Sequence, residues 1–407
     1  MKCILHIGTE KTGTTTLQHF LHANKLQLQE QGYGVLNSVG KGNNRRLANY
    51  AMRNNHKDDY SKAHNILTEE RKIEYDKETK TIFENEINSL KNDCHTIIIT
   101  SEHFHSRCIY DDEVEKLKNL LTIYFDKIEI VVYLRPQIDV AISLYTTILR
   151  SGGISEFTQF LPKNCNINNI YYDYDNLLQR WTNVFGKKSV FPKIFDPKLF
   201  IEGDLIKDFL GLIKIADIKK LQFFKNANES LTPFGQELLR LNNLNKLPFK
   251  DFIYKNTNKL FAGKGCTPDK EEAKKVQEQF EISNQKVAKE WFNKDELFTL
   301  NYDKYKKVGL EKKDKIILEN IFLEKDIKLF QNIFSTNNIS AFSKLSESLL
   351  PNANSADILR DVAIAFESIN DIQTAKKVMQ QAHLLRPNGP VIKKKLDEYK
   401  KILENKR

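Results

Sequence analysis

The stretch Cys3-Ile4-Leu5-His6-Ile7-Gly8-Thr9-Glu10-Lys11-Thr12-Gly13-Thr14-Thr15-Thr16 decides the fold of this chain. Its first five residues form a short apolar run that is typical of a buried strand, and Leu17, Phe20 and Leu21 follow at helical spacing. A strand, a tight glycine-containing loop and a helix in this order form the opening of a βαβ unit. The sequence therefore predicts an α/β protein.

Further strands and helices continue this alternation. The runs 96–100 and 128–134 are nearly continuous in β-branched residues, which is typical of strands buried on both faces of a parallel sheet. Shorter strands are expected at 33–36 and 189–194, and helices at about 60–92, 111–123 and 137–150. The alternation predicts a P-loop-like, doubly wound parallel sheet flanked by helices. Residues 38–60 show no period and are expected to form a loop or lid.

From about residue 200 onward the pattern is almost entirely helical. We expect one domain over 1–305, an α/β core with a helical extension, and an all-helical C-terminal region over 306–407. Residues 356–389 fit the spacing of one tetratricopeptide-like unit of two antiparallel helices. The positions that match are Leu359, Val362, Ala363, Phe366, Ala375, Met379, Ala382 and Pro387. Because arrays of this kind need about three units, a docked helical hairpin and a surface for a protein partner both remain open.

The composition fits a globular protein, and its basic surplus indicates either a solvated, Lys-rich surface or an anionic ligand. There are 63 Lys and Arg against 53 Asp and Glu, a formal net charge of +10. Such a surplus suits nucleotides, sulfated glycans or nucleic acid without choosing among them, and we expect no nucleic-acid partner. The five cysteines form no CxxC pair, which favours a reducing compartment. No apolar stretch is long enough to span a bilayer, so we expect a cytoplasmic protein.

The N-terminal loop departs from the nucleotide-triphosphate signature G-x-x-x-x-G-K-[ST] in one informative position. Gly8 and Gly13 have the required separation, but Thr14 follows the second glycine and the lysine lies inside the loop, at Lys11. A triphosphate enzyme uses its lysine on the β- and γ-phosphates and holds Mg²⁺ nearby. A lysine midway along the loop would instead reach the oxygen that bridges phosphorus and sulfur in a phosphosulfate, where it neutralises the leaving phosphate without a metal.

This loop resembles the 5′-phosphosulfate-binding loop of sulfotransferases that use 3′-phosphoadenosine 5′-phosphosulfate (PAPS). The resemblance implies transfer of a sulfuryl group from PAPS to an acceptor hydroxyl, with no metal required. It also implies a donor-binding role for Gly8, Lys11, Thr12, Gly13, Thr14, Thr15 and Thr16.

A second motif agrees with the first. Arg135 follows the strand that ends at Leu134, and Ser143 comes eight residues later on the next predicted helix. Sulfotransferases carry the same strand, Arg and Ser to hold the 3′-phosphate. An Arg at the carboxyl end of a strand lies where open α/β sheets bind ligands, and its planar fork suits a phosphate. The resemblance therefore assigns Arg135 and Ser143 to the 3′-phosphate.

The general base has three candidates after the strand 96–100. The family places a His or a Glu there, and the sequence reads Ser101-Glu102-His103-Phe104-His105. Glu102 is the first choice because the resemblance is to a subtype that carries Ser-x-Glu or Ser-Glu at this position. His103 is second, since an imidazole titrates near neutrality, with an ordinary pKa of about 6.5, and His105 is third.

Weaker matches extend the resemblance to about residue 300. Residues 171–174, 228–232 and 283–284 resemble segments of bacterial carbohydrate sulfotransferases, which favours a cell-envelope glycan or another carbohydrate as the acceptor. The segment 262–265 is the nearest candidate for a C-terminal 3′-phosphate loop. The segment 43–46, with two asparagines and two arginines, is expected to be a solvated loop, with contact to an acidic acceptor as the alternative.

Two other functions remain open. A small-molecule kinase would need a lysine after the second glycine and an Asp at a strand end for Mg²⁺; the first is missing, and Arg135 stands where the second would lie. A non-enzymatic scaffold with a degenerate nucleotide fold would use the helical tail for protein contacts, but it has no need of Lys11.

Overall fold

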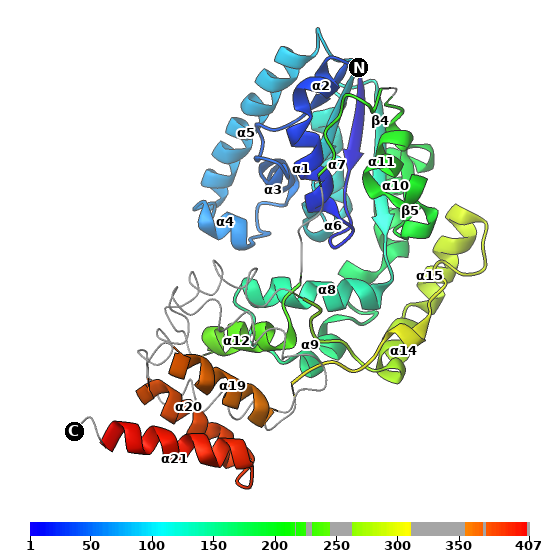
Figure 1. Cartoon of the computed structure of the whole chain (residues 1–407). Helices are drawn as coiled ribbons and strands as arrows, with labels where there is room; N and C mark the ends of the chain where they lie inside the picture. The colour runs from blue at the N-terminus through cyan, green and yellow to red at the C-terminus, as the bar shows by residue number, and fades with distance from the viewer. Residues whose placement is uncertain (216, 225–229, 245–262, 311–354, 369–371, 405–407) are drawn as a thin grey trace. The chain divides into compact units, whose positions relative to one another are not determined.

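The computed structural model describes residues 1–407 except 216, 225–229, 245–262, 311–354, 369–371 and 405–407 (Figure 1). The chain divides into two compact units. The first comprises Met1–Ala141, Leu161–Ala227 and Ala273–Tyr302, and the second Ile142–Phe160, Asn228–Glu272 and Asp303–Arg407. The domain boundary that the sequence places at 305 stays a prediction.

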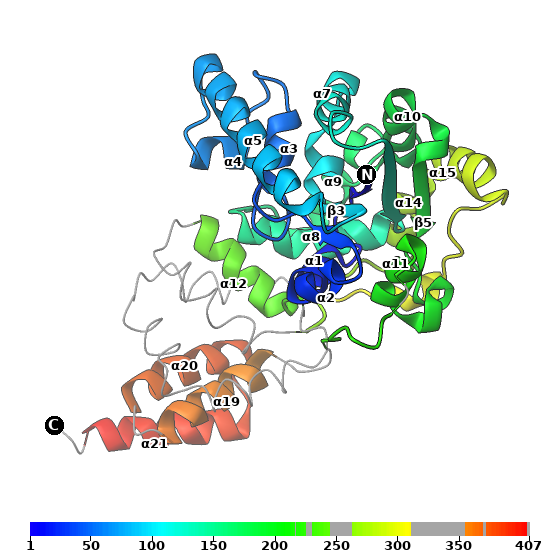
Figure 2. The same ribbon diagram turned by 90° about the horizontal axis from the view of Figure 1, so that it is seen from above.

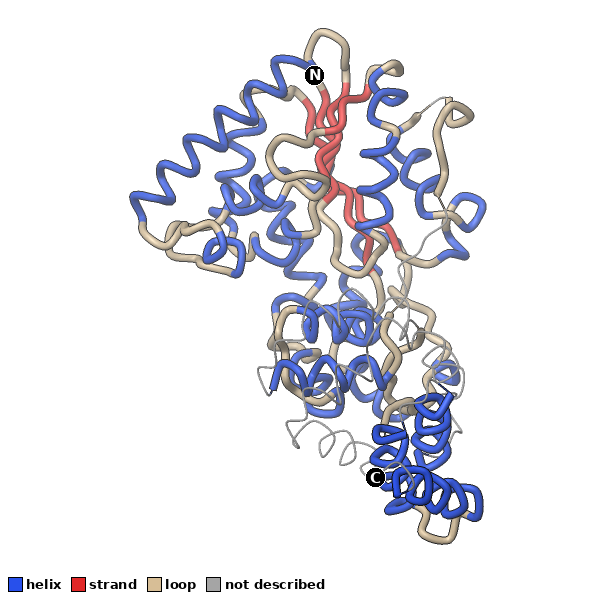
Figure 3. Tube along the Cα trace, turned by 60° about the vertical axis from the view of Figure 1, so that its left-hand side comes forward, coloured by secondary structure: helices blue, strands red, loops and turns tan. Residues whose placement is uncertain are grey.

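A five-stranded parallel sheet forms the centre of the first unit. Its strands are β1 (Lys2–His6), β2 (Tyr33–Val35), β3 (Thr96–Thr100), β4 (Lys127–Leu134) and β5 (Val190–Ile194), in the order β2-β3-β1-β4-β5. Figure 3 shows these strands side by side. The strand β1 is central, so the loop that follows it lies between the carboxyl ends of β3 and β4. This is the edge at which parallel sheets bind their ligands.

Helices cover both faces of this sheet (Figure 2). The helices α5 (Glu69–Leu90), α7 (Asp111–Leu121) and α10 (Tyr174–Phe185) pack on one face, and α1 (Thr14–Ala23), α2 (Lys25–Gln29) and α11 (Leu205–Ile213) on the other. Side chains of a strand alternate between faces, so Leu5 joins the first core and Ile4 the second. The predicted fold class, a parallel sheet flanked by helices, is confirmed.

The region between β2 and β3 differs from the prediction. Two short helices, α3 (Arg45–Ala51) and α4 (Asp59–Ala63), lie within the segment expected to be an unpatterned loop or at its end, and the expected helix over 60–92 is divided into α4 and α5. The side chain of Asp58 accepts a hydrogen bond from the Ser61 amide and caps α4. Arg45 is only 7% exposed, so the expectation of a solvated loop over 43–46 is wrong. Its ion pair with Asp58 compensates the charge that burial would otherwise leave unpaired.

Seven further helices of eight or more residues lie among the described residues after β4. They are α8 (Gln137–Arg150), which has the predicted bounds, α9 (Phe157–Asn164), α12 (Pro233–Leu244), α14 (Lys270–Glu278), α19 (Ser355–Ser368), α20 (Ile372–Leu385) and α21 (Pro390–Glu404). The shorter helices α6 (His103–Arg107) and α15 (Glu281–Val287) also belong to the first unit. Among the described residues, no helix combines the length and the apolar character that crossing a bilayer would take.

The C-terminal helices α19 and α20 pack against each other in the second unit. Their buried alanines, Ala363, Ala375 and Ala382, permit a close approach, and Arg386 closes the pair through Asp357 at 3.0 Å. The structure therefore contains two packed helices in the predicted range, with α21 packed against α20, and their assignment to a tetratricopeptide-like unit stays a prediction. The part of the all-helical prediction over 306–407 that falls on 311–354 lies outside the described residues.

Candidate active site

The loop after β1 is held by the end of β4. The Tyr133 amide donates to the Gly8 carbonyl at 2.8 Å, and the Thr9 amide and hydroxyl both donate to the Tyr133 carbonyl, at 3.1 and 3.0 Å. The Thr12 hydroxyl donates to the Thr9 carbonyl at 2.6 Å. The Thr9 hydroxyl proton is therefore used on β4 and that of Thr12 inside the loop, which makes the loop a preformed turn.

The two glycines of the loop adopt backbone conformations that are unfavourable for other residues. Gly8 and Gly13 have φ values of +107° and +75°, a region that costs residues with a Cβ strain. A Cβ on Gly13 would also lie 2.4 Å from a methyl carbon of Leu205. A Cβ on Gly8 would lie 3.2 Å from the Glu102 Cα, so the loop and the segment after β3 are in close contact there.

Helix α1 begins directly after Gly13, whose carbonyl accepts the first helical hydrogen bond, from Leu17 at 3.0 Å. The amides of Thr14, Thr15 and Thr16 therefore belong to the first turn, where amides have no acceptor within the helix and favour an anion. Thr14 is buried, Thr16 is half-buried and Thr15 is exposed.

Lys11 and Arg135 are in direct contact, through the backbone of Lys11. Lys11 is half-buried and takes a left-handed conformation with φ 64°, and the Arg135 guanidinium donates to its carbonyl at 2.8 Å. The guanidinium also lies 5.6 Å from the centre of the Phe195 ring. The end of β4 thus brings a second cation to the loop, as the sequence predicts for a strand-end arginine.

The segments 171–174 and 283–284, which carry the weaker resemblance, form hydrogen bonds at and after Arg135. The Tyr174 hydroxyl donates to the Arg135 carbonyl at 2.5 Å. Gln137 donates to the Asn284 side chain at 2.8 Å and to the Tyr172 carbonyl at 3.2 Å. Ser283 donates to Asp173 at 2.7 Å. Residues 171–174 and 283–284 therefore fix the turn between β4 and α8.

Glu102 lies on the opposite side of the loop from Arg135, just after β3. Gln18, in the second turn of α1, donates to its carboxylate at 2.6 Å. Burial raises the pKa of Glu102 above its ordinary value, and the negative charge of Glu10 adds to the rise, while Gln18 and Lys11 oppose it. A carboxylate with a raised pKa is a stronger base than a solvated one.

His103 neighbours Glu102 but differs from it in basicity. Its Nε2 atom lies 3.8 Å from the Glu102 carboxylate and 3.4 Å from the Asn43 amide nitrogen. Burial, with the positive charge of Arg45, lowers the pKa of His103 to about 4. The expectation that His103 titrates near 6.5 is therefore wrong, because a buried imidazole beside a guanidinium resists protonation.

His105 contacts the segment 171–174. It is buried, its Nε2 atom lies 2.9 Å from the Tyr171 carbonyl, and burial lowers its pKa to about 4. This contact engages one ring nitrogen of His105 with the segment 171–174. The place of His105 as the third candidate base stays a prediction.

Glu10 is a residue of this site that the sequence interpretation missed. Its carboxylate accepts a hydrogen bond from the Tyr171 hydroxyl at 3.0 Å. Burial opposes its ionisation, but hydrogen bonding to Ser106 and the nearby imidazoles outweigh burial and hold the pKa of Glu10 below its ordinary value. The signal was present, since Glu10 precedes Lys11 in the loop motif. Gln18 could have been found as well, because it lies one turn after Thr14 on α1.

Ser143 falls on α8 in the second unit and is half-buried. One turn later, Thr146 accepts a hydrogen bond from Gln236 at 2.8 Å, and Gln236 accepts one from the Cys266 amide, also at 2.8 Å. The Gly263 amide donates to the Ser230 carbonyl at 2.7 Å. The segment 263–266 is thus tied to the helix that carries Ser143. Ala262, Asn228 and Glu229 lie outside the described residues.

Comparisons with known proteins give distant similarities. No family model matches the sequence. An uncharacterized protein of Archaeoglobus fulgidus is 30% identical over 212 residues, which are 50% of this chain and 56% of that protein. The chain thus matches little more than half the length of this relative. The crystal structure of a sulfotransferase from Alicyclobacillus acidocaldarius aligns with 60% of this chain and 94% of its own, with a TM-score of 0.36 and 16% identity.

Proposed function

We propose that this chain is a sulfotransferase that moves a sulfuryl group from PAPS to an acceptor hydroxyl, on a cell-envelope glycan or another carbohydrate. The observation that carries the proposal is the arrangement around the loop Gly8–Gly13. Lys11 and Arg135 meet on one side of it, through the 2.8 Å hydrogen bond. Glu102, a carboxylate of raised pKa, adjoins its other side.

Each of these residues has one task in the proposed reaction. The acceptor oxygen forms a bond to sulfur while the bond from sulfur to the bridging oxygen of the phosphosulfate breaks. Glu102 takes the proton of the acceptor hydroxyl. Lys11 and the first-turn amides of α1 stabilise the negative charge that develops on the departing phosphate. Arg135 and Ser143 bind the 3′-phosphate, and no metal ion takes part.

Two measurements test this function. The purified protein is incubated with ³⁵S-labelled PAPS and a panel of cell-envelope glycans, and we expect label in at least one glycan. In parallel, thermal unfolding is followed with 3′-phosphoadenosine 5′-phosphate (PAP) without Mg²⁺ and with ATP plus Mg²⁺. Stabilisation by PAP alone supports the proposal. Stabilisation by ATP with Mg²⁺ alone would favour a kinase instead.

We further propose that the tetratricopeptide-like pair α19–α20 is an accessory surface for a protein partner. Its supporting features are the buried alanines between the two helices and their match to the repeat spacing. Deleting residues from 351 onward should preserve sulfuryl transfer. A deletion that abolishes transfer while PAP binding persists would instead give the tail a role in the reaction.

A further inference from the structure

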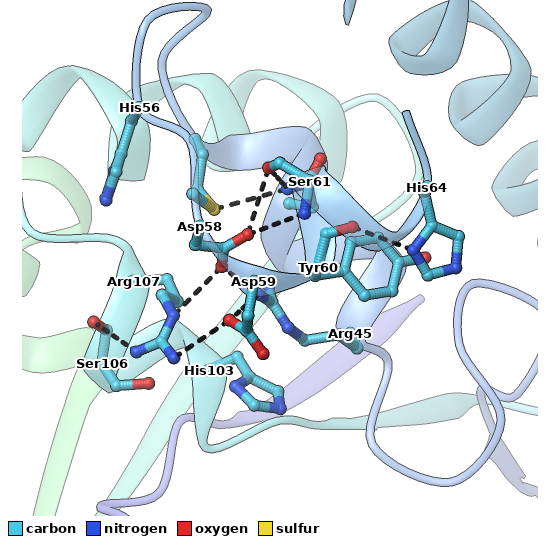
Figure 4. A network of polar contacts seen from close by, with 12 residues as sticks. Arg45, His56, Asp58, Asp59, Tyr60, Ser61, His64, His103, Ser106 and Arg107 are labelled. Carbon is cyan, nitrogen blue, oxygen red and sulfur yellow. Dashed lines mark hydrogen bonds and ion pairs between the residues drawn. The ribbon is translucent and has the colours of Figure 1, made fainter. Parts of the chain in front are cut away.

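Four charged side chains gather next to His103, from three segments of the first unit (Figure 4). Arg45 comes from the start of α3, Asp58 and Asp59 from the start of α4, and Arg107 from the end of α6. We call these four residues the charged cluster. Its formal charge is zero, yet its two carboxylates are bound very differently.

The inner carboxylate, Asp58, is fully engaged. It is bonded to Arg45, accepts a hydrogen bond from Arg107 Nε at 3.1 Å, and accepts two more from the amide and hydroxyl of Ser61, at 2.9 and 3.1 Å. Although burial favours its neutral form, these partners hold the pKa of Asp58 at about 2. Asp58 therefore is a fixed anion that positions both arginines.

The outer carboxylate, Asp59, is held loosely. Its side chain is 81% exposed, and its oxygen lies 3.5 Å from Arg107 Nη2 and 3.7 Å from Arg45 Nη2. An exposed ion pair at such distances contributes little to stability. Arg45 has, in addition, a buried Nη1 atom for which the structure records no hydrogen-bond partner. Arg107 Nη1 donates to the Ser106 carbonyl at 3.3 Å, so the donor capacity that Asp59 uses only in part lies at Nη2 of the two arginines.

The cluster adjoins His103, which in turn adjoins the candidate base. Figure 4 shows His103 beside Asp59, with Arg45 and Arg107 on either side. The charges of Arg45, Arg107 and Asp59 all act on His103, and His103 Nε2 is 3.8 Å from Glu102. An acceptor hydroxyl that reaches Glu102 therefore brings its neighbouring groups close to the cluster.

We propose that the charged cluster is a specificity site for a carboxylate of the acceptor, which replaces Asp59 on Arg45 and Arg107. Its assignment to the acceptor rests on the proposed sulfotransferase function. Guanidinium groups bind carboxylates through paired, charge-assisted hydrogen bonds. Asp59 acts as an internal substitute that keeps the two arginines in place when the site is empty. The acceptor class is then a uronic-acid glycan rather than a neutral one.

The test measures binding and needs no transfer step. The probes are a hexasaccharide of alternating glucuronate and N-acetylglucosamine, and the same hexasaccharide with each carboxylate converted to its primary amide. Calorimetry on the full chain with PAP present should give an affinity about tenfold higher for the acid than for the amide, the effect of one charge-assisted hydrogen bond. Equal affinities, or no binding of either probe, would overturn the proposal.

Matched variants separate this site from general attraction to a basic protein. Arg107→Gln should lose the preference for the acid probe. Arg53→Gln removes the same charge at an arginine that pairs with Asp112 outside the cluster, and it should retain the preference. Asp59→Asn should tighten binding of the acid probe up to about fivefold, since the displaced pair is weak. Asp112→Asn, also an exposed partner of an arginine, should not tighten it. If Arg107→Gln and Arg53→Gln have equal effects, or Asp59→Asn and Asp112→Asn do, the charged cluster is not the site that binds the carboxylate.

Two further measurements keep the outcomes distinct. Thermal unfolding of each variant checks the fold. If Arg107→Gln is unstable, Arg107→Lys, which keeps the charge, replaces it. Arg107→Lys should lose part of the preference for the acid probe because Lys lacks the planar fork of Arg. PAP binding alone tests the donor site. If PAP fails to bind while the acid probe shows the expected preference, the proposed function fails and the carboxylate site stands.

Discussion

The donor loop and the charged cluster both adjoin the segment that carries Glu102 and His103, and they are built in opposite ways. In the loop, the hydroxyl protons of Thr9 and Thr12 are used on the loop itself or on β4. Around the cluster, Arg45 Nη1 and His103 Nδ1 are buried without a recorded partner. Buried polar atoms of this kind are costly unless something else satisfies them. The comparison teaches that the fold itself satisfies the loop hydroxyls, whereas it leaves two buried polar atoms around the cluster without a recorded partner, at the place where our proposal puts the acceptor.

The largest expected effect comes from the boundary between these two regions. Glu102→Gln keeps the shape and the hydrogen bond with Gln18 but removes the proton acceptor, so kcat should fall by about 10² to 10⁴. PAP affinity, measured by calorimetry, should be preserved. His103→Gln is the matched variant and should mainly raise the KM of the acceptor. If His103→Gln abolishes transfer while Glu102→Gln retains it, the two roles must be exchanged.

The second prediction concerns a substitution in the loop Gly8–Gly13 that leaves the charged cluster unchanged. Lys11→Ala should leave the fold intact, because the loop is held by backbone and threonine hydrogen bonds, but it should lower kcat by about hundredfold, as for loss of one transition-state donor. Single-turnover kinetics with labelled PAPS measures the effect. Near-normal turnover in this variant would refute the assignment of the loop.

The third prediction concerns how the donor side distinguishes nucleotides. Arg135→Ala should weaken binding of PAP by about tenfold or more, the cost of losing a charge-assisted hydrogen bond. Adenosine 5′-phosphosulfate, which has no 3′-phosphate, should lose far less affinity. Calorimetry with both nucleotides compares them directly. Equal losses would mean that Arg135 does not read the 3′-phosphate.

The smallest expected effect links the two sides through Glu10. Its negative charge helps to raise the pKa of Glu102, so Glu10→Gln should lower that pKa. Glu102 acts as a base only when ionised, and activity is lost as the pH falls through its pKa. The acidic limb of the kcat/KM profile should therefore move to lower pH in Glu10→Gln.

Tyr171→Phe supplies the control for this shift. It removes the hydroxyl that donates to Glu10 at 3.0 Å but leaves the charge of Glu10 in place. We expect the acidic limb of this variant to stay close to that of the unchanged chain. A limb that moves equally in both variants would show that packing, rather than the charge of Glu10, controls the basicity of Glu102.

The sequence could predict the fold class, and which residues lie at the strand ends, because those signals are local. The alternation of buried strands and helices gave the fold class, and the helix over 137–150 has the predicted bounds. The loop Gly8–Gly13 and Arg135 are each readable from residues adjacent to a strand end. The structure adds that they touch, through the Lys11 carbonyl.

The charged cluster could not be predicted, because its contacts join segments with no periodic pattern. Arg45 meets Asp58 across the turn between α3 and α4, and Asp58 meets Arg107 from beyond β3. An arginine with charged and polar neighbours in the sequence reads as solvated, whereas here a buried carboxylate compensates its burial. The low pKa of His103 was missed for the same reason, since burial and the charge of Arg45 are tertiary effects.

The central position of β1 in the sheet has a consequence for the order in which the protein is made. Lys2 pairs with Thr96 on one side and with Lys127 on the other, so β1 waits for both neighbours while the ribosome adds residues at about 5 to 20 per second. Until β4 has emerged, one edge of β1 has no partner within the sheet, and an open strand edge invites pairing with other chains. The donor loop takes its shape from Tyr133, near the end of β4. A nascent chain that stops before this residue therefore has the glycines and Lys11 of the loop but lacks the strand that shapes them.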